Sequence, residues 1–337
     1  MNPDTFISAI AHRDTMPALD QISQRQPAKG PGLLVIVCTL MFLLIAVSGQ
    51  ATVITDSDGV EHRFEAPFKR IISLYPAHTE NLVEMGAEDN LIGISTADTY
   101  PESVLAKPRF SYHDSLEKFI AARPDCILIR PMIAHATPNL VNKLRHYGIT
   151  VISLQPTSIK ELFSYWENLG SISGAKAGAR DMILAFQAGL DQMNEQVKLI
   201  PEVKRPRVYF EAIHARMKTF SPDSIAMFCL RSAGGINVAT DADPRRSTNI
   251  AAYSKERILA RAEEIEVFLA QYGRMNRISV EEIVNEPGFG AIAAIRSGRV
   301  HLVEEHLVSR PTTRLLEGIE TINRLLYRDN LSLTKTP

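Results

Sequence analysis

The sequence predicts an α/β protein in which two Rossmann-like lobes with parallel-sheet cores are joined by a single long α-helix and enclose a ligand cleft. Three observations support this fold class. Short apolar strands alternate with helices from about residue 68 to 156, the alternation stops between residues 158 and 200, and it resumes after residue 206. Such alternation is typical of a parallel sheet covered on both faces. A length of 337 residues also fits two domains.

Residues 52–157 form the predicted first lobe. It opens with a hairpin, because two short strands flank the turn sequence around Asp58-Gly59. Gly86 and Gly148 each follow a helical segment, which is where glycine commonly ends a helix. The expected strands are 52–54, 60–64, 70–74, 91–95, 125–129 and 150–154, and the expected helices are 79–85, 116–122 and 140–147.

Residues 158–204 are predicted to link the lobes. The segment contains no convincing strand, and apolar residues recur in it at intervals of three and four, as on the buried face of a helix. These residues are Ile183, Phe186, Leu190, Met193 and Val197. Pro201 and Pro206 bracket the exit from this segment. We therefore expect one long amphipathic helix between the two lobes.

Residues 205–330 form the predicted second lobe. Gly234-Gly235 is interpreted as a helix stop, since it follows a helical segment. The expected strands are 208–210, 265–269 and 300–303, and the expected helices are 224–233, 255–262, 280–285 and 314–327. Ligands of open α/β sheets bind beyond the carboxyl ends of the strands. Two such sheets facing each other would place a ligand between the lobes.

Residues 1–51 are interpreted as a leader that contains a signal peptide or a membrane anchor. An apolar run without charges extends from residue 33 to 47, after Arg25 and Lys29, and small residues surround Ala51. This layout is typical of a secretory signal peptide, although the run is almost long enough to cross a bilayer. In either case the remainder of the chain is expected outside the cytoplasm, periplasmic or otherwise extracytoplasmic.

The composition argues against several other classes of protein. The formal net charge is −1 and no basic run is present, so we expect no nucleic-acid partner. Cys38, Cys126 and Cys229 lack zinc-site spacing. We interpret Cys126 and Cys229 as buried apolar residues, with a disulfide between them as the alternative. No nucleophile elbow, P-loop or dinucleotide fingerprint is present, so the chain is not expected to be an enzyme.

Several segments, taken in order, resemble one family. They are Arg70–Glu80 (RIISLYPAHTE), Met85-Gly86-Ala87, residues 91–95, 115–129, 233–237 (AGGIN), 254–259 (SKERIL) and 294–300, and Arg310-Pro311. Together they resemble the class III periplasmic binding proteins, which serve ABC importers of iron siderophores, haem and cobalamin. The resemblance covers roughly residues 52–328. Residues 261–265 lack the Pro-Asp that is usual in the second lobe, and residues 270–276 match no well-known subgroup, so the ligand is left open.

This resemblance implies capture of a metal chelate and its delivery to an ABC permease and its ATPase. The chain would act as a monomer, without a cofactor of its own, and its ligand would be an iron or cobalt chelate. The family docks one surface carboxylate of each lobe on the permease, and the matching residues are Glu117 and Glu256. A local interpretation also exists. Asp114 to Glu117 has capping-box spacing, and Glu256 falls in a first helical turn after Ser254.

Candidate ligand-binding residues follow the predicted strands. Tyrosines offer aromatic faces to a flat chelate, arginines pair with acidic groups, and a histidine can be an axial ligand of haem or cobalt. The candidates are Tyr75, Pro76, Tyr100, Tyr112, His113, Arg130, His135, His214, Arg216 and Arg310.

Other interpretations of these residues remain open. Each candidate can be an ordinary loop residue, and Arg310 can form a salt bridge that orders the last helix. His113, His135 and His214 would be the ligands if the chain bound zinc or manganese ions directly. A membrane-tethered chelate sensor is a further alternative, which an uncleaved apolar segment would favour.

Overall fold

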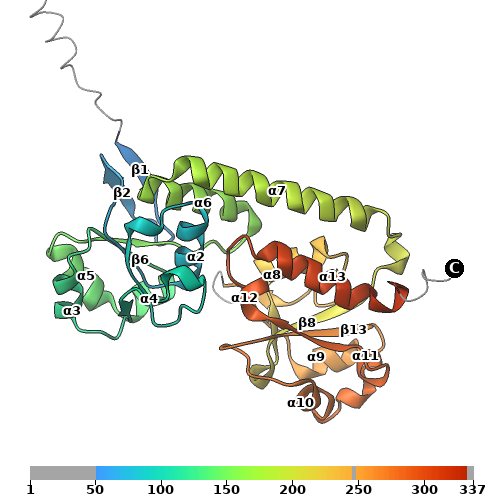
Figure 1. Ribbon diagram of the computed structural model, residues 1–337. Coiled ribbons are helices and arrows are strands. Elements are labelled where there is room, and N and C mark those ends of the chain that lie inside the picture. Colours follow the sequence, from blue (N-terminus) through green and yellow to red (C-terminus); the bar gives the residue numbers. More distant parts are fainter. Residues whose placement is uncertain (1–50, 245–247, 332–337) are drawn as a thin grey trace, which may run out of the picture. The chain divides into compact units, whose positions relative to one another are not determined.

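A computed structural model describes residues 51–244 and 248–331 (Figure 1). The predicted leader, with its apolar run 33–47 and Cys38, lies outside the described residues, apart from Ala51. Within the described ranges, none of the helices is long and apolar enough to cross a membrane.

The first sheet has the strand order β5-β4-β3-β6-β7 and is parallel throughout. Its central pairing aligns Ile71 of β3 with Cys126 of β6. The strands are β3 (Ile71–Ser73), β4 (Leu91–Ser95), β5 (Arg109–Phe110), β6 (Cys126–Ile129) and β7 (Thr150–Ser153). The associated helices are α2 (Pro76–Glu84), α3 (Leu116–Ala122), α4 (Pro131–Ala136) and α5 (Pro138–His146). The predicted hairpin is present as β1 (Thr52–Thr55) and β2 (Glu61–Phe64). The alternation therefore predicted the four main strands of this lobe.

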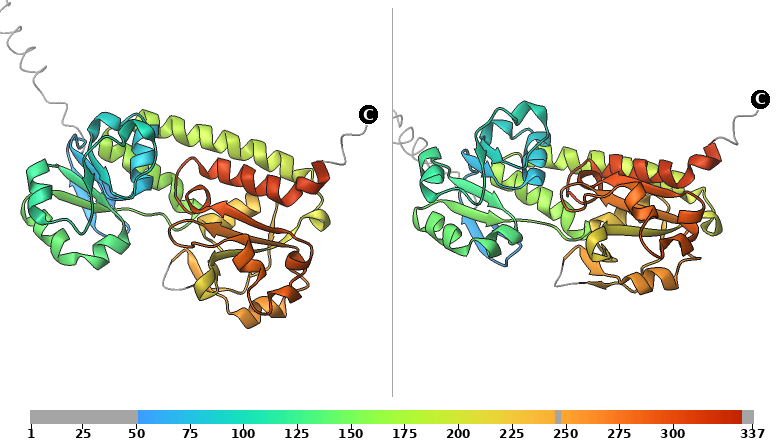
Figure 2. Two further views of the ribbon diagram at one scale, coloured as in Figure 1. Left: turned by 60° about the horizontal axis from the view of Figure 1, so that its bottom comes forward. Right: turned by 90° about the horizontal axis from the view of Figure 1, so that it is seen from below.

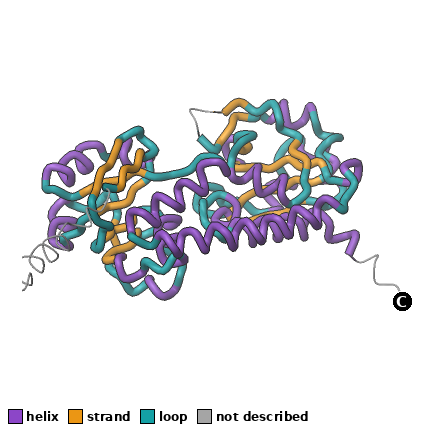
Figure 3. The backbone as a smooth tube through the Cα atoms, turned by 90° about the horizontal axis from the view of Figure 1, so that it is seen from above, coloured by secondary structure: helices purple, strands orange, loops and turns teal. Residues whose placement is uncertain are grey.

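The linking segment contains two helices where the sequence predicted one. The expected long helix is α7 (Lys176–Lys198), which Figure 3 shows as an unbroken rod. A second helix, α6 (Ile159–Ser173), precedes it and was not predicted. The break falls at Gly174, whose φ of +80° is the left-handed conformation that glycine adopts without a steric penalty. The predicted long helix is therefore confirmed as α7, and the segment 158–204 holds an additional helix that was not predicted.

The second sheet combines parallel and antiparallel strands. Figure 2 shows the lobe that contains it from two directions. The parallel strands β8, β13 and β14 were predicted, whereas the short parallel strand β10 and the antiparallel strands β9, β11 and β12 were not. The strands are β8 (Arg207–Ile213), β9 (Lys218–Phe220), β10 (Ile236–Asn237), β11 (Asp243–Pro244), β12 (Ile250–Ala252), β13 (Val267–Tyr272) and β14 (Val300–Glu304). The helices are α8 (Ile225–Ser232), α9 (Lys255–Ala260), α10 (Val280–Val284), α11 (Ala293–Arg296), α12 (Glu305–Val308) and α13 (Leu315–Leu331).

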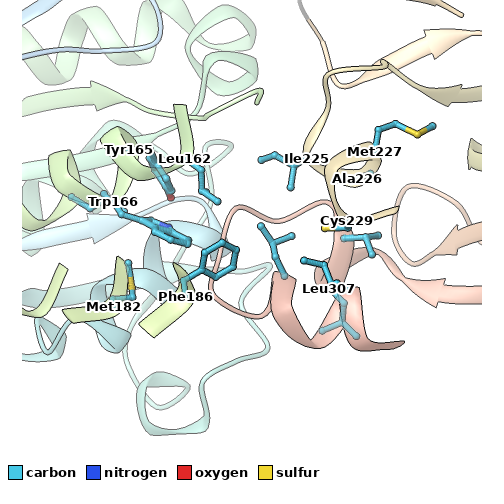
Figure 4. Close-up of a cluster of buried hydrophobic side chains, with 14 of the residues drawn as sticks. Leu162, Tyr165, Trp166, Met182, Phe186, Ile225, Ala226, Met227, Cys229 and Leu307 are labelled. Atoms are coloured by element: carbon cyan, nitrogen blue, oxygen red, sulfur yellow. The ribbon is translucent and has the colours of Figure 1, made fainter. Parts of the chain in front are cut away.

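One apolar core runs from the helices of the first lobe into those of the second. Trp166 on α6 and Phe186 on α7 pack edge to face, with ring centroids 5.1 Å apart. Ile225 of α8 and Leu307 of α12 belong to the same cluster (Figure 4). Burying one such side chain contributes about 1.5–3 kcal/mol. The same core packs the linking helices against both lobes.

Cys126 and Cys229 are both free and fully buried. This confirms their interpretation as apolar core residues, and the alternative of a disulfide between them was wrong. Burial raises the pKa of the Cys126 thiol well above its ordinary value, so this thiol stays protonated and unreactive.

Candidate ligand-binding site

Tyr75 and Pro76 lie where β3 passes into α2. Tyr75 has an extended backbone and caps the helix, and Pro76 occupies the first turn, where its missing N–H has no cost. The Ser73 hydroxyl donates to the Tyr75 carbonyl at 3.0 Å, and Thr79 Oγ1 donates to Ser73 Oγ at 2.8 Å. These buried hydrogen bonds fix the position of the Tyr75 backbone at the carboxyl edge of the first sheet.

Arg130 covers the ring of Tyr75. It follows β6, the strand beside β3, and its guanidinium carbon lies 4.9 Å from the ring centroid. Burial raises the pKa of the Tyr75 phenol, so the ring stays neutral and suited to a cation–π contact. Both residues were predicted from the sequence, and the structure brings them together.

Tyr100 forms a second stack with an arginine that comes from the other lobe. It lies in the loop after β4, and the guanidinium carbon of Arg314, just before α13, is 4.7 Å from its ring centroid. Tyr100 was predicted as a site residue from the sequence, whereas Arg314 was not. The available signal was a second arginine four residues after Arg310, at the first position of the predicted helix 314–327.

Arg310 bridges the two lobes through an ion pair. Its Nη1 lies 2.9 Å from Oε1 of Glu80, a buried residue on α2. The neighbouring Pro311 carbonyl accepts hydrogen bonds from Asn81 Nδ2 at 2.9 Å and from Trp166 Nε1 at 3.1 Å. Burial raises the pKa of the Glu80 carboxyl in spite of the adjacent arginine. The structure thus supports the salt-bridge interpretation of Arg310.

Asp98 adds a second buried carboxyl beside this ion pair. Only 2% of its surface is exposed, and burial raises the pKa of its carboxyl to about 6. His78, on α2, is also buried. Its Nε2 lies 2.8 Å from the Leu154 carbonyl, and burial lowers the pKa of this imidazole to about 4. Neither side chain was predicted as a site residue, because the local sequence does not show that a polar residue in a loop, such as Asp98, or on a helix, such as His78, is buried.

Three of the named histidines have unrelated neighbours. The exposed His113 packs on Tyr112, with ring centroids 4.1 Å apart, and His135 pairs with Asp58 of the hairpin at 3.1 Å. His214 lies in the second lobe. Among residues 51–244 and 248–331, no group of three or more His, Cys, Asp or Glu side chains could hold a metal ion. The alternative prediction that these three histidines bind zinc or manganese together was therefore wrong.

His214 belongs to a buried polar cluster at the end of β8. Its Nδ1 lies 2.7 Å from Oε1 of Glu211, and its Nε2 lies 3.5 Å from Oε2 of Glu286. The Glu211 carboxylate raises the pKa of this imidazole. The His214 backbone N–H donates to Asn276 Oδ1 at 2.9 Å. These contacts hold the ring within its own lobe, whereas the nearby Arg216 is exposed.

Glu117 and Glu256 occupy matching positions in the two lobes. Each is exposed and lies second in its helix, α3 or α9, after a serine at the N-cap. Hydrogen bonds with Glu117's own backbone and the Ser115 hydroxyl lower the pKa of Glu117, and the Ser254 hydroxyl does so for Glu256. Both side chains are therefore ionised at neutral pH.

The predicted capping box before α3 is wrong. Ser115, rather than Asp114, is the N-cap residue, and Asp114 Oδ2 accepts hydrogen bonds from the Ser111 N–H and Lys118 Nζ. Ser254 caps α9, as its hydroxyl accepts from the Arg257 N–H.

A separate cavity of about 450 Å³ lies at the amino ends of β8, β13 and β14 and contains none of the named residues. Two arginines in its wall donate to carbonyls at the ends of helices. Arg205 Nη2 donates to Val197 O at 3.2 Å, and Arg299 Nη2 donates to Leu326 O at 2.7 Å. These side chains cap α7 and hold the last turns of α13.

Comparisons with known proteins agree with this architecture. The family model described as periplasmic binding protein matches residues 71–306. An uncharacterised ABC transporter substrate-binding lipoprotein of Bacillus subtilis strain 168 is 25% identical over 264 residues, covering 77% of this chain and 81% of the relative. A vitamin B12-binding protein of Vibrio vulnificus strain YJ016 is 24% identical over 259 residues, covering 76% and 89% respectively.

A solved structure also resembles the chain. The crystal structure of a possible iron-binding, periplasmic solute-binding protein from Staphylococcus epidermidis ATCC 12228 superimposes with a TM-score of 0.68 at 25% identity. The comparison covers 78% of this chain and all of the other. The resemblance described from the sequence segments is thereby confirmed. Because the family model spans more than half of its residues, this chain belongs to the periplasmic binding protein family.

Proposed function

We propose that this protein captures a metal chelate outside the cytoplasm and delivers it, chemically unchanged, to an ABC permease and its ATPase. The observation that carries this proposal is the pair of tyrosine–arginine stacks after strands of the first sheet, Arg130 on Tyr75 and Arg314 on Tyr100. Aromatic faces suit the flat or bulky shell of a chelate, and guanidinium groups suit its acidic substituents. Relatives named for vitamin B12 and for iron support the same ligand class.

Direct titration tests the capture step. The purified chain should bind at least one of cyanocobalamin, haem, a ferric hydroxamate and a ferric carboxylate chelate, as measured by calorimetry and by quenching of Trp166 fluorescence. Trp166 is the single tryptophan and lies fully buried in the inter-lobe core, so it reports rearrangement of that core. Chromatography of the recovered ligand should return it unmodified. Binding of none of these chelates, or their conversion to a product, contradicts the proposal.

Glu117 and Glu256 are the proposed permease contacts. Their equivalent positions on two lobes suit a partner with two arginine-lined surfaces, and close interfacial charge pairs couple by about 1.5–7 kcal/mol. The double variant Glu117→Ala/Glu256→Ala should abolish uptake by cells that carry the cognate importer, with chelate affinity unchanged. A matched control removes the exposed Glu84 and Glu281 instead. Normal uptake by the first variant, or equal loss in the control, contradicts this assignment.

The tethered sensor remains the second candidate. A chain that retains residues 33–47 would stay bound to the membrane, so mass measurement of the mature amino terminus distinguishes cleaved from uncleaved protein. Uptake that depends on the chain identifies delivery, whereas a sensor would bind the same chelate without supporting its uptake.

A further inference from the structure

Arg314 joins the two lobes without being fully neutralised. It precedes α13 of the second lobe and stacks on Tyr100 of the first, which is 46% exposed. Its carboxylate neighbours are distant or solvated. Glu80 Oε2 lies 3.9 Å from its Nη1, and Glu317, whose side chain is 57% exposed, lies 3.5 Å from its Nε. A guanidinium with such weak pairing keeps attraction for a further anion.

Glu80 cannot neutralise both arginines beside it. Its Oε1 is engaged by Arg310 at 2.9 Å, so only the longer contact of its Oε2, at 3.9 Å, is left for Arg314. The Arg314 side chain is 24% exposed, which leaves part of it within reach of a ligand. In a stacked guanidinium the N–H groups point outward in the plane of the group. A carboxylate in that plane can accept two parallel hydrogen bonds.

We propose that Arg314, held by Tyr100, recognises an ionised acidic group of the chelate, and that the chain therefore selects acidic chelates over neutral ones. Arg314 is then a specificity-determining residue supplied by the second lobe to a site that is otherwise built on the first. Arg130 on Tyr75 provides a second cation for the same ligand class. This inference rests on the proposed function, because it specifies the charge of the captured chelate.

The test compares acidic and neutral probes on the full chain and three variants. The probes are haem with free carboxylates, haem dimethyl ester, ferric citrate, cyanocobalamin and a neutral ferric trihydroxamate. Two of the variants are Arg314→Gln and the control Arg324→Gln, which removes an exposed arginine from α13, the helix that Arg314 precedes. Arg314→Lys keeps the charge but loses the planar fork, and circular dichroism checks that each variant folds.

We expect the wild-type chain to bind an acidic probe more tightly than any neutral one. Arg314→Gln should weaken binding of that acidic probe by about tenfold or more, Arg314→Lys should weaken it less, and Arg324→Gln should leave it unchanged. Affinity for neutral probes should be the same in all variants. Preference for a neutral probe, or equal loss for acidic and neutral probes, overturns the inference while leaving chelate capture intact. A wild-type chain that binds none of the probes contradicts the proposed function itself.

Discussion

Replacing Arg310 with methionine should destabilise the protein strongly at neutral pH and only weakly in acid. The variant leaves Glu80, with 3% of its side chain exposed, without the guanidinium 2.9 Å away. Removing one partner of a buried pair typically costs about 3–5 kcal/mol, because the remaining charge stays desolvated. Arg314 lies 3.9 Å from the other carboxylate oxygen and compensates in part, so we expect a loss of about 3 kcal/mol.

The pH dependence of the stability loss distinguishes an uncompensated Glu80 charge from a loss of side-chain packing. Burial already raises the pKa of Glu80 above its unfolded value, and removing Arg310 raises it further. A group with a raised folded pKa stabilises the fold below its unfolded pKa, and that contribution is lost as pH rises through the folded value. The loss of unfolding free energy caused by Arg310→Met, here called the deficit, should therefore shrink toward about 1 kcal/mol as the pH falls toward the unfolded pKa of Glu80.

Urea unfolding at both pH values measures the deficit, and two further variants test its origin. In a Glu80→Gln background the carboxylate that pairs directly with Arg310 is absent, so the same arginine replacement should cost about 1 kcal/mol or less. Arg216→Met, at an exposed arginine, should change stability by about 0.5 kcal/mol or less. A deficit for Arg310→Met that is independent of pH, or unchanged by Glu80→Gln, would refute the reasoning.

Two further predictions concern helix contacts and buried charge. Gly178→Ala should lower the free energy of unfolding by about 1–3 kcal/mol, because the new Cβ would lie 2.0 Å from the Met85 carbonyl oxygen. In Gly189→Ala, on the same helix, the new Cβ meets the flexible end of the Leu316 side chain. This variant should change the free energy of unfolding by less than about 1 kcal/mol in chemical denaturation. Asp98→Asn removes a carboxyl whose folded pKa of about 6 exceeds its ordinary 3.8. The free energy of unfolding of the wild type should therefore fall by about 2 kcal/mol relative to that of this variant between about pH 4.5 and 7.5, as measured by urea titrations. Stability–pH curves of the two proteins that run parallel would contradict this.

The strands that could be predicted from sequence are those buried on both faces. Residues 91–95 and 126–129 are short apolar runs between helices, and this signal exists only when helices cover both sides of a parallel sheet. β9 (KTF) and β12 (IAA) escaped prediction because neither lies in a run of bulky apolar residues, whereas the three residues of β3 lie within the run RIISL. The break at Gly174 was missed because the helical period continues on both sides of a single glycine.

Residues of the candidate site could be predicted only where their position at the end of a single strand was enough to identify them. Tyr75 and Arg130 were found because each directly follows an apolar strand. Local sequence could not give the partners of those residues, which depend on how the strands are ordered in the sheet. The histidines were grouped by chemical type alone, and the structure places His135 beside the hairpin and His214 at the end of β8.

The contacts between the lobes could not be predicted from local sequence patterns. Glu80 and Arg310 are 230 positions apart, and Trp166 reaches the Pro311 carbonyl across 145. Nothing in the pattern around Glu80 distinguishes a buried carboxylate from an exposed one on the first helix of a lobe. Its burial follows from the packing of α2 against residues 310–312 of the second lobe. The same packing leaves the neighbouring Arg314 without a full counter-charge. The proposed preference for acidic chelates therefore depends on the contact between the lobes and not on any one sequence motif.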